Sequence, residues 1–170
     1  MRKNRRHNNL SPLEQALKLL TVRPRSKWEL KQLLLDRKYT KDEIEQVISS
    51  LINWGYLDDI KFIESWCYYR KHVSPKSRCF VLRELKAKGV SSSDLESCFN
   101  DFYSEEEELD CLKHLMEKKL TKKHLISSKI NEKDMQKIFS ALLRKGFNYN
   151  LILDIFSQLG TKHLDNFQEK

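Results

Sequence analysis

The sequence predicts an all-α protein built from three tandem three-helix repeats, about nine helices in all, in an elongated and curved arrangement. Two features of the composition predict the fold class. The 170 residues include only 4 Gly and 3 Pro, too few for the turns of a many-stranded sandwich or barrel, and Leu, Lys, Glu and Ile predominate as in helical proteins. Internal repetition predicts the arrangement, because repeats of this kind stack mainly against their neighbours.

The repetition is anchored on a short turn that occurs three times. Residues 37–40 (RKYT), 88–91 (KGVS) and 145–148 (KGFN) share the order basic residue, turn residue, apolar residue and helix N-cap, at separations of 51 and 57 residues. Counted from the apolar residue of each turn, further apolar residues coincide five and nine positions before it and five, eight, nine and twelve after it. This spacing is the buried stripe of amphipathic helices, so two helices should flank each turn.

Local signals explain how these turns and helices begin. Gly89 and Gly146 suit the left-handed position after a helix, whereas Lys38 fills the equivalent position of the first repeat, which predicts backbone strain. Ser26 and Thr40 are each followed three residues later by Glu, the pattern of a capping box. Ser91 and Asn148 are N-cap residues at the positions equivalent to Thr40.

The repeats set the expected domain boundaries. Pro24 and Pro75 are also 51 residues apart, and each is followed by a basic residue and Ser, so they mark equivalent helix-entry corners. We expect a flexible basic N-terminal tail (residues 1–9), repeats at residues 10–57, 58–104 and 105–160, and a C-terminal tail (residues 161–170).

The composition also limits the environment of the protein. No apolar run approaches the roughly 20 residues that cross a bilayer, and the basic start lacks the apolar stretch of a signal peptide. Cys67, Cys79, Cys98 and Cys111 contain no CxxC pair, so we expect buried free thiols rather than a metal site or disulfides. These features predict a cytoplasmic protein without a membrane partner.

Charge is distributed by position in the repeat. The formal net charge is +8, but residues 1–27 carry +7, residues 61–90 +6 and residues 113–146 +7, while residues 91–112 carry −8. Stacked repeats could align the basic helices along one face that binds polyanions. A solvated surface of mixed charge is the alternative. A helix-turn-helix DNA reader at residues 26–54 is disfavoured, because its second helix would bring Asp42, Glu43 and Glu45 among phosphates.

No residue pattern predicts catalysis. The string Gly55, Tyr56, Leu57, Asp58 and Asp59 contains adjacent carboxylates, but it is better explained as a helix stop, two packing residues and an N-cap for the next helix. Residues 105–108, four consecutive Glu, suit a helix start. The histidines have no Ser or Cys partner at a catalytic spacing, and no Gly-rich phosphate loop is present.

Five aromatic residues allow two interpretations. They could stack on unpaired bases beside cations if they were exposed, whereas packing in the core or between repeats is the commoner role of such residues. The second interpretation is favoured. These residues are Trp28, Trp54, Trp66, Tyr68 and Tyr69.

Several strings resemble the RecX regulatory proteins from about Leu13 to Leu159. The most specific are GYLDD at residues 55–59 and RELKAKGV at residues 83–90, supported by RKGF at residues 144–147. The second repeat departs from the family pattern at residues 74–77 (SPKS), where a glycine is common. The resemblance implies three helical repeats that bind the RecA filament on DNA and modulate, usually inhibit, its strand exchange, ATP hydrolysis and co-protease function.

Charge and position, together with this resemblance, select the candidate contact residues. We expect no cofactor, no metal and no catalytic residue, and a monomer that contacts the RecA filament, with single- or double-stranded DNA as a further candidate partner. A stand-alone DNA-binding protein is the alternative function, and a nuclease is motivated only by the two Asp of GYLDD. The candidate cations are Arg23, Arg25, Lys27, Lys31, Lys76, Arg78, Arg83, Lys86 and Lys88.

Overall fold

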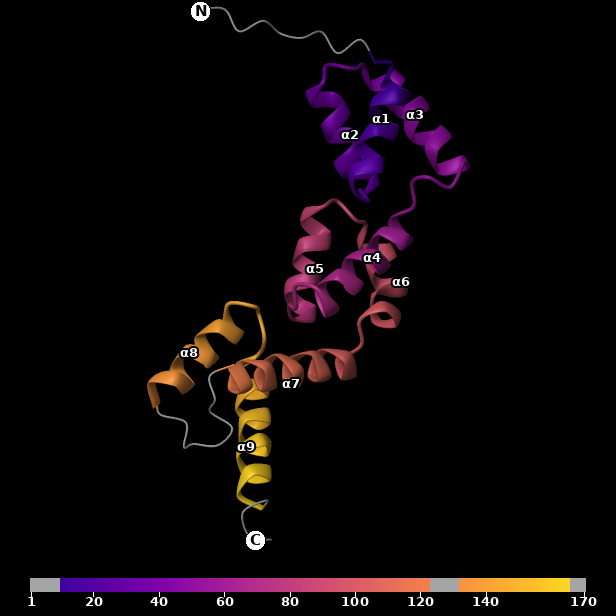
Figure 1. Ribbon diagram of the computed structural model, residues 1–170. Helices are drawn as coiled ribbons and strands as arrows, with labels where there is room; N and C mark the ends of the chain where they lie inside the picture. The colour runs from indigo at the N-terminus through magenta and orange to yellow at the C-terminus, as the bar shows by residue number, and fades with distance from the viewer. Residues whose placement is uncertain (1–9, 123–131, 166–170) are drawn as a thin grey trace, which may run out of the picture. The chain divides into compact units, whose positions relative to one another are not determined.

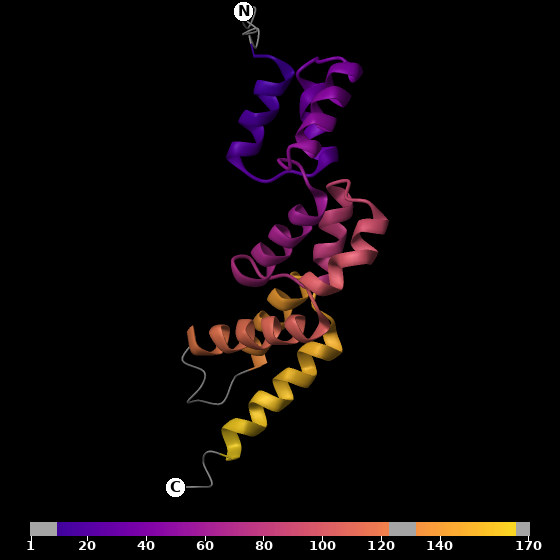
Figure 2. The same cartoon turned by 90° about the vertical axis from the view of Figure 1, so that its right-hand side faces the viewer.

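The computed structural model describes residues 10–122 and 132–165, and within them it contains nine helices and no strand (Figures 1 and 2). The predicted all-α class is therefore confirmed. The helices are α1 (Pro12–Val22), α2 (Lys27–Asp36), α3 (Lys41–Asn53), α4 (Asp59–His72), α5 (Arg78–Ala87), α6 (Ser92–Phe102), α7 (Glu105–Lys122), α8 (Glu132–Leu143) and α9 (Tyr149–Asp165). None of them combines the length and apolar character that crossing a bilayer requires.

The helices follow the predicted triplets, and the first and third triplets each enclose a core. Helices α1, α2 and α3 pack around one apolar cluster, in which Leu30, Leu34 and Leu51 are fully buried. Helices α7, α8 and α9 enclose a second cluster, with Leu142 and Ile152 at its centre. The coinciding positions nine and five residues before the turn and five after it are buried in all three repeats, because each helix turns its apolar stripe to its neighbours.

The structure describes part of the predicted C-terminal tail and none of the predicted N-terminal tail. The predicted tail at residues 1–9 lies outside the described residues, and so do residues 166–170. Helix α9 continues to Asp165, so residues 161–165 of the expected C-terminal tail are helical.

The predicted turn geometry is present in all three triplets. Gly89 and Gly146 adopt positive φ values of 72° and 88°, and Lys38 adopts 71° at the equivalent position. The strained lysine predicted from the alignment is therefore confirmed. The N-caps that follow also form: the Ser91 hydroxyl accepts from the amide of residue 94, and the Asn148 side chain accepts from the amide of residue 150.

The prediction of a capping box is confirmed at Thr40 and wrong at Ser26. At Thr40 the reciprocal bonds with Glu43 are both present. At Ser26 the hydroxyl accepts from the amide of Glu29, but the Glu29 carboxylate turns away to two cations instead of returning to the Ser26 amide. At this position the carboxylate pairs with two cations, whereas a capping box would give it one uncharged amide donor, which explains the choice.

Burial of the cysteines is more varied than expected. Cys67 is buried, Cys98 and Cys111 are partly exposed, and Cys79 is exposed on α5. The expectation of a buried thiol is thus wrong for Cys79. All four are free cysteines.

The chain forms two compact units whose boundaries cut through α4, α5 and α6. Unit 1 contains the described residues up to Ser65 together with Leu85–Cys98, and unit 2 contains Trp66–Glu84 together with the described residues from Phe99 onward. Each unit therefore joins parts of two consecutive triplets. Each is described by itself below.

In unit 1, α4 and the second turn contact the start of α2. The Asp59 carboxylate, in the first turn of α4, accepts a hydrogen bond of 2.9 Å from the amide of Lys27, the first residue of α2. The Ser26 hydroxyl donates to the carbonyl oxygen of Lys88 in the turn before α6. The N-terminus of α2, where amides lack partners within the helix, is thus completed by residues of the next triplet.

Unit 2 repeats this arrangement one triplet later. The Glu108 carboxylate, in the first turn of α7, accepts 2.9 Å from the amide of Arg78, the first residue of α5. The amide of Ser77 donates 3.0 Å to the carbonyl oxygen of Lys145. Lys27 and Arg78 are 51 residues apart, so the same positions make the same contacts in both units.

The turns of Gly89 and Gly146 approach the second helix of the preceding triplet so closely that they exclude a side chain. A Cβ at Gly89 would lie 2.2 Å from Cγ of Trp28, and a Cβ at Gly146 would lie 2.6 Å from Oγ of Ser77 and 3.0 Å from Cβ of Phe80. A Cβ at Gly55 would meet nothing within 4 Å. Gly89 and Gly146 are therefore required by packing as well as by their positive φ.

The GYLDD string has a structural role in unit 1. Gly55, with φ of 74°, follows the end of α3, and Leu57 is buried in the first core. Asp58 caps α4 by accepting from the amides of residues 60 and 61, as predicted for one of the two Asp. The expected packing of Tyr56 is wrong, because 64% of its surface is exposed. Asp59 caps α2 of the preceding triplet, which the linear sequence does not reveal.

We expect Gly89→Ala to destabilise the protein more than Gly55→Ala. Both substitutions place a side chain in the left-handed region, at about 1–2 kcal/mol, but only Gly89→Ala also displaces the Trp28 ring, which adds about 1–3 kcal/mol. Urea unfolding followed by circular dichroism measures both. Equal losses would show that the turn does not press against α2.

Substitutions of Asp59 separate its role as an acceptor from its charge. Burial raises the pKa of Asp59 above its usual value of 3.8, although the Lys27 amide opposes this. Asp59→Asn keeps an acceptor and should leave the free energy of unfolding unchanged or higher at pH 7. Asp59→Ala leaves the Lys27 amide without its acceptor and should cost about 1–2 kcal/mol.

The pH dependence gives a second check on Asp59. Because its folded-state pKa is raised, the wild-type carboxyl contributes most stability at acid pH and loses that contribution as the pH rises through the folded-state value. Asn does not titrate. Relative to wild type, Asp59→Asn should therefore gain stability as the pH rises above 3.8, and urea unfolding at several pH values measures the trend. A gain on acidification would contradict the assignment.

Candidate functional site

Two of the candidate cations in unit 1 pair with one carboxylate. Lys88 Nζ lies 2.8 Å and Arg23 Nη2 3.1 Å from Oε1 of Glu29, whose side chain is 13% exposed. Burial alone would raise the pKa of Glu29, but the hydrogen bonds and charges of Arg23 and Lys88 outweigh it and lower that pKa. These two cations thus stabilise the corner between α1 and α2 and its contact with the second turn.

The other candidates of unit 1 differ in their availability. Lys31 forms an exposed ion pair of 2.7 Å with Glu45, which contributes little to stability. Lys27 donates its amide to Asp59, while its side chain is half-buried. Arg25 donates its Nε to the Leu19 carbonyl at 3.4 Å, and burial, followed by the charge of Arg23, lowers its pKa.

Arg78 in unit 2 is held by the fold. Its Nε donates 2.8 Å to the Tyr103 carbonyl, Nη1 lies 3.2 Å from Glu105, and Nη2 donates to the Asn100 side chain. The guanidinium also lies over the Phe99 ring, and only 16% of the side chain is exposed. Arg78 therefore fixes α5 to the region between α6 and α7.

Three candidates on and before α5 are more accessible. Lys76 Nζ lies 4.1 Å and Arg83 Cζ 5.6 Å from the centroid of the Phe80 ring, so two cations flank one aromatic side chain. Arg83 and Lys86 are exposed on α5. Lys76 and Arg83 belong to unit 2 and Lys86 to unit 1, so each unit has accessible cations on or beside α5.

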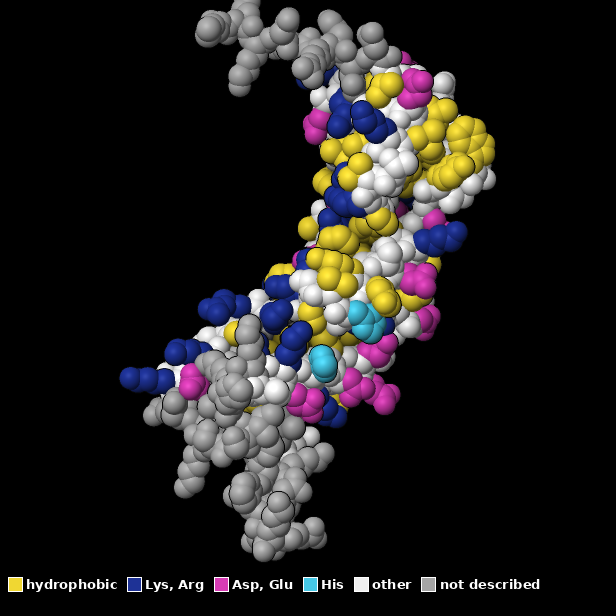
Figure 3. Space-filling view, in the orientation of Figure 1, with side chains coloured by type: hydrophobic (Ala, Val, Ile, Leu, Met, Phe, Trp, Pro, Cys, Tyr) yellow, Lys and Arg dark blue, Asp and Glu magenta, His cyan; other side chains and the backbone are white. Residues whose placement is uncertain are grey.

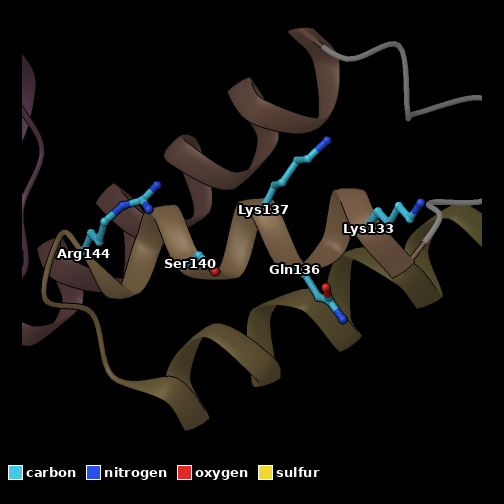
Figure 4. A pocket seen from close by; sticks show the side chains of 5 residues that line it. All are labelled: Lys133, Gln136, Lys137, Ser140 and Arg144. Carbon is cyan, nitrogen blue, oxygen red and sulfur yellow. The ribbon is translucent and has the colours of Figure 1, made fainter.

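A further cationic surface lies on α8, and the sequence reasoning missed it. Four α8 side chains and that of Arg144, the residue after the helix, line an open cavity of about 420 Å³ (Figure 4). Lys and Arg side chains are visible over this helix in Figure 3. The charges of residues 113–146 indicated the region, and the spacing of its cations on one helix is the signal that could have found it. We call this surface the α8 cavity: Lys133, Gln136, Lys137, Ser140 and Arg144.

Lys145, just beyond α8, lies near other cations of unit 2. Its Nζ donates 2.9 Å to the Pro75 carbonyl. Burial, followed by the charges of Lys76 and Lys119, lowers its pKa. Neighbouring cations that repel one another favour an anionic ligand, because the ligand relieves that repulsion.

These surfaces have the composition of anion-binding sites. Among the described residues, no group of His, Cys, Asp and Glu could hold a metal ion. Exposed Lys and Arg side chains beside amide and hydroxyl groups bind phosphates, with an affinity that falls as salt rises. The class defined by the fold and these surfaces is a tandem three-helix repeat protein with cationic faces.

Comparison with known proteins gives the family. The model of the RecX first three-helix domain matches residues 13–51, and that of the RecX third three-helix domain matches residues 105–156. The regulatory protein RecX of Mycolicibacterium smegmatis is 30% identical over 143 residues, which cover 84% of this chain and 76% of the relative. The chain belongs to the RecX family of regulatory proteins, as the resemblance of GYLDD and RELKAKGV implied.

Other relatives agree with this assignment. The regulatory protein RecX of Streptomyces coelicolor is 28% identical over 86% of this chain and 78% of its own length. The chain spans 60% of the length of its relative from Leuconostoc mesenteroides and about half of that from Bacillus subtilis. The crystal structure of RecX from Lactobacillus salivarius has a TM-score of 0.69 at 23% identity and covers 88% of this chain and 95% of that chain, which supports the fold.

We expect Glu29→Gln to lower stability and raise affinity for polyanions. Loss of two ionic hydrogen bonds should cost about 1–3 kcal/mol at pH 7, while the charge of Glu29 no longer offsets those of Arg23 and Lys88. Since the pKa of Glu29 is lowered, its contribution is present above the usual value of 4.5 and is lost as the pH falls through the folded-state value. Urea unfolding and DNA-binding anisotropy measure the two effects.

Glu64→Gln is the matched control for this substitution. It changes the net charge equally, and Glu64 is an exposed α4 residue of unit 1. Its stability should change by less than about 0.5 kcal/mol. An equal rise in DNA affinity for both variants would show that net charge, rather than the loss of charge beside Arg23 and Lys88, causes the effect.

Proposed function

We propose that this protein binds the RecA nucleoprotein filament and modulates it, in the inhibitory direction usual for the family. The affected activities would be strand exchange, ATP hydrolysis and co-protease function, within DNA repair and the SOS response. Membership of the RecX family carries the proposal, because the matches include the first and third domains of that family. The protein would act in the cytoplasm, as a monomer and without chemistry of its own.

Cationic surfaces in both units support this function. Arg25, Lys31 and Lys86 in unit 1, and Lys76 and Arg83 in unit 2, lie at or near the surface, and the α8 cavity adds further cations. A ligand shifts a filament between conformations only through different affinities for them. Contacts with RecA and with the DNA phosphates supply such a difference if they fit one state of the filament better than the other.

Stand-alone DNA binding is the second candidate function. The α8 cavity favours it, because its three cations, amide and hydroxyl are groups that contact phosphates. Binding to DNA without RecA, with an affinity as high as for the filament, would support it. A filament regulator instead binds the RecA-coated strand more tightly than the bare strand.

RecA-dependent ATP hydrolysis on single-stranded DNA tests the proposed function directly. Titration of the protein should lower the hydrolysis rate, and a variant with Lys133→Glu, Lys137→Glu and Arg144→Glu should need roughly tenfold more protein for the same inhibition, because phosphate contacts become repulsive. The absence of both inhibition and filament binding by wild type would refute the proposal.

A charge-matched variant completes the experiment. Lys18→Glu, Lys41→Glu and Lys118→Glu alter three exposed cations outside the α8 cavity and change the net charge by the same amount. Its inhibition should stay within about threefold of wild type, since net charge acts weakly at physiological salt. Equal losses in both triple variants would exclude the α8 cavity as a specific contact.

A further inference from the structure

An open pocket in unit 1 has no role in the contacts described so far. Its volume is about 350 Å³, and its lining comes from the end of α1, the following corner, the GYLDD string and the first turns of α4. Its lining includes Leu20, Arg25, Tyr56, Asp58, Lys61 and Phe62. Pockets of this size with apolar walls and a few polar groups bind small ligand groups.

Aromatic surface is exposed beside this pocket. Tyr56, which lines it, is 64% exposed, and Trp54, two residues earlier, is 56% exposed. Hydrophobic side chains gather near the end of α3 in Figure 3. The expectation that Trp54 and Tyr68 pack in the core or between repeats is wrong, because both are largely exposed, Tyr68 at 62%. Large aromatic side chains left in solvent next to a pocket indicate a binding surface.

The charged groups of the pocket leave it cationic. Arg25 uses its Nε on the Leu19 carbonyl, so its terminal NH groups can contact an anion in the bidentate manner of a guanidinium. Lys61 is exposed on the first turn of α4. The Asp58 carboxylate already accepts from the amides of residues 60 and 61, so its charge is partly offset by the start of the helix.

We propose that this pocket holds an unpaired base of single-stranded DNA, stacked on Tyr56, while Arg25 and Lys61 contact the adjoining phosphates. An exposed ring beside two cations is the arrangement that single-strand binders use. A base within a duplex is already stacked and paired, so it cannot enter the pocket without being flipped out. The assignment deepens the proposed function by naming the nucleic acid that unit 1 contacts.

Three DNA ligands and no recombinase test the assignment. Fluorescence anisotropy measures the affinity of wild type and Tyr56→Ala for an oligothymidylate, for an abasic strand of equal length, and for a blunt duplex of that length. Tyr56→Ala should weaken binding to the oligothymidylate at least about fivefold and leave binding to the other two within about twofold. Tyr56→Phe keeps the ring and should retain wild-type affinity.

Matched variants separate stacking from charge and from misfolding. Arg25→Gln and Lys61→Gln should each weaken binding to the oligothymidylate and to the abasic strand alike, and lower the salt dependence by about 0.7 per lost phosphate contact. Lys41→Gln, at the first residue of α3, and Tyr68→Ala, at an exposed aromatic residue of unit 2, serve as controls and should change nothing. Thermal unfolding verifies that all variants fold.

Other outcomes would overturn the assignment. Equal weakening of all three ligands by Tyr56→Ala would show that the ring has no contact specific to bases. Unchanged DNA binding by Tyr56→Ala, combined with weaker binding to the RecA filament, would assign the pocket to a side chain of the protein partner. Because the assay contains no RecA, its failure leaves the inhibition of RecA to be judged separately.

Discussion

The fold depends on how the start of the second helix in one triplet is completed by the triplet that follows. Four amides at a helix N-terminus lack partners within the helix, and a buried N-terminus without acceptors is costly. The Lys27 amide finds its acceptor in Asp59, and the Arg78 amide in Glu108. Neither carboxylate belongs to the triplet that it completes, so each of these helices is finished only when the next triplet folds against it.

This exchange explains why the compact units do not coincide with the triplets. A unit that contains α2 must also contain the start of α4 and the turn of Lys88, because they supply its missing contacts. The ion pair between Lys88 and Glu29 adds to the same contact. In unit 2, the Lys145 side chain likewise bonds to the Pro75 carbonyl before α5. Helical periodicity defines the repeats, while contacts between repeats define the units.

Much of the architecture could be predicted from the sequence because its causes are local. The apolar stripes, the left-handed turn positions and the caps at Thr40, Ser91 and Asn148 depend on residues a few positions apart. The partner of Glu29 could not be predicted this way, since Lys88 lies 59 residues away. For the same reason, Arg23, Arg78 and Lys88 resembled free cations in the sequence, whereas the fold pairs each with carboxylates. Exposure of Tyr56 and Trp54 also requires the three-dimensional arrangement.

The residue type at each turn matches whether another triplet packs against that turn. Lys38, Gly89 and Gly146 share one backbone conformation, but only the two glycines press against a helix of the preceding triplet. The first triplet has no such neighbour within the described residues, so a lysine is tolerated at its turn. A rearranged chain that placed residues 10–57 behind another module would bring the Lys38 side chain against that module. A chain in which this triplet follows another one would therefore need Lys38→Gly.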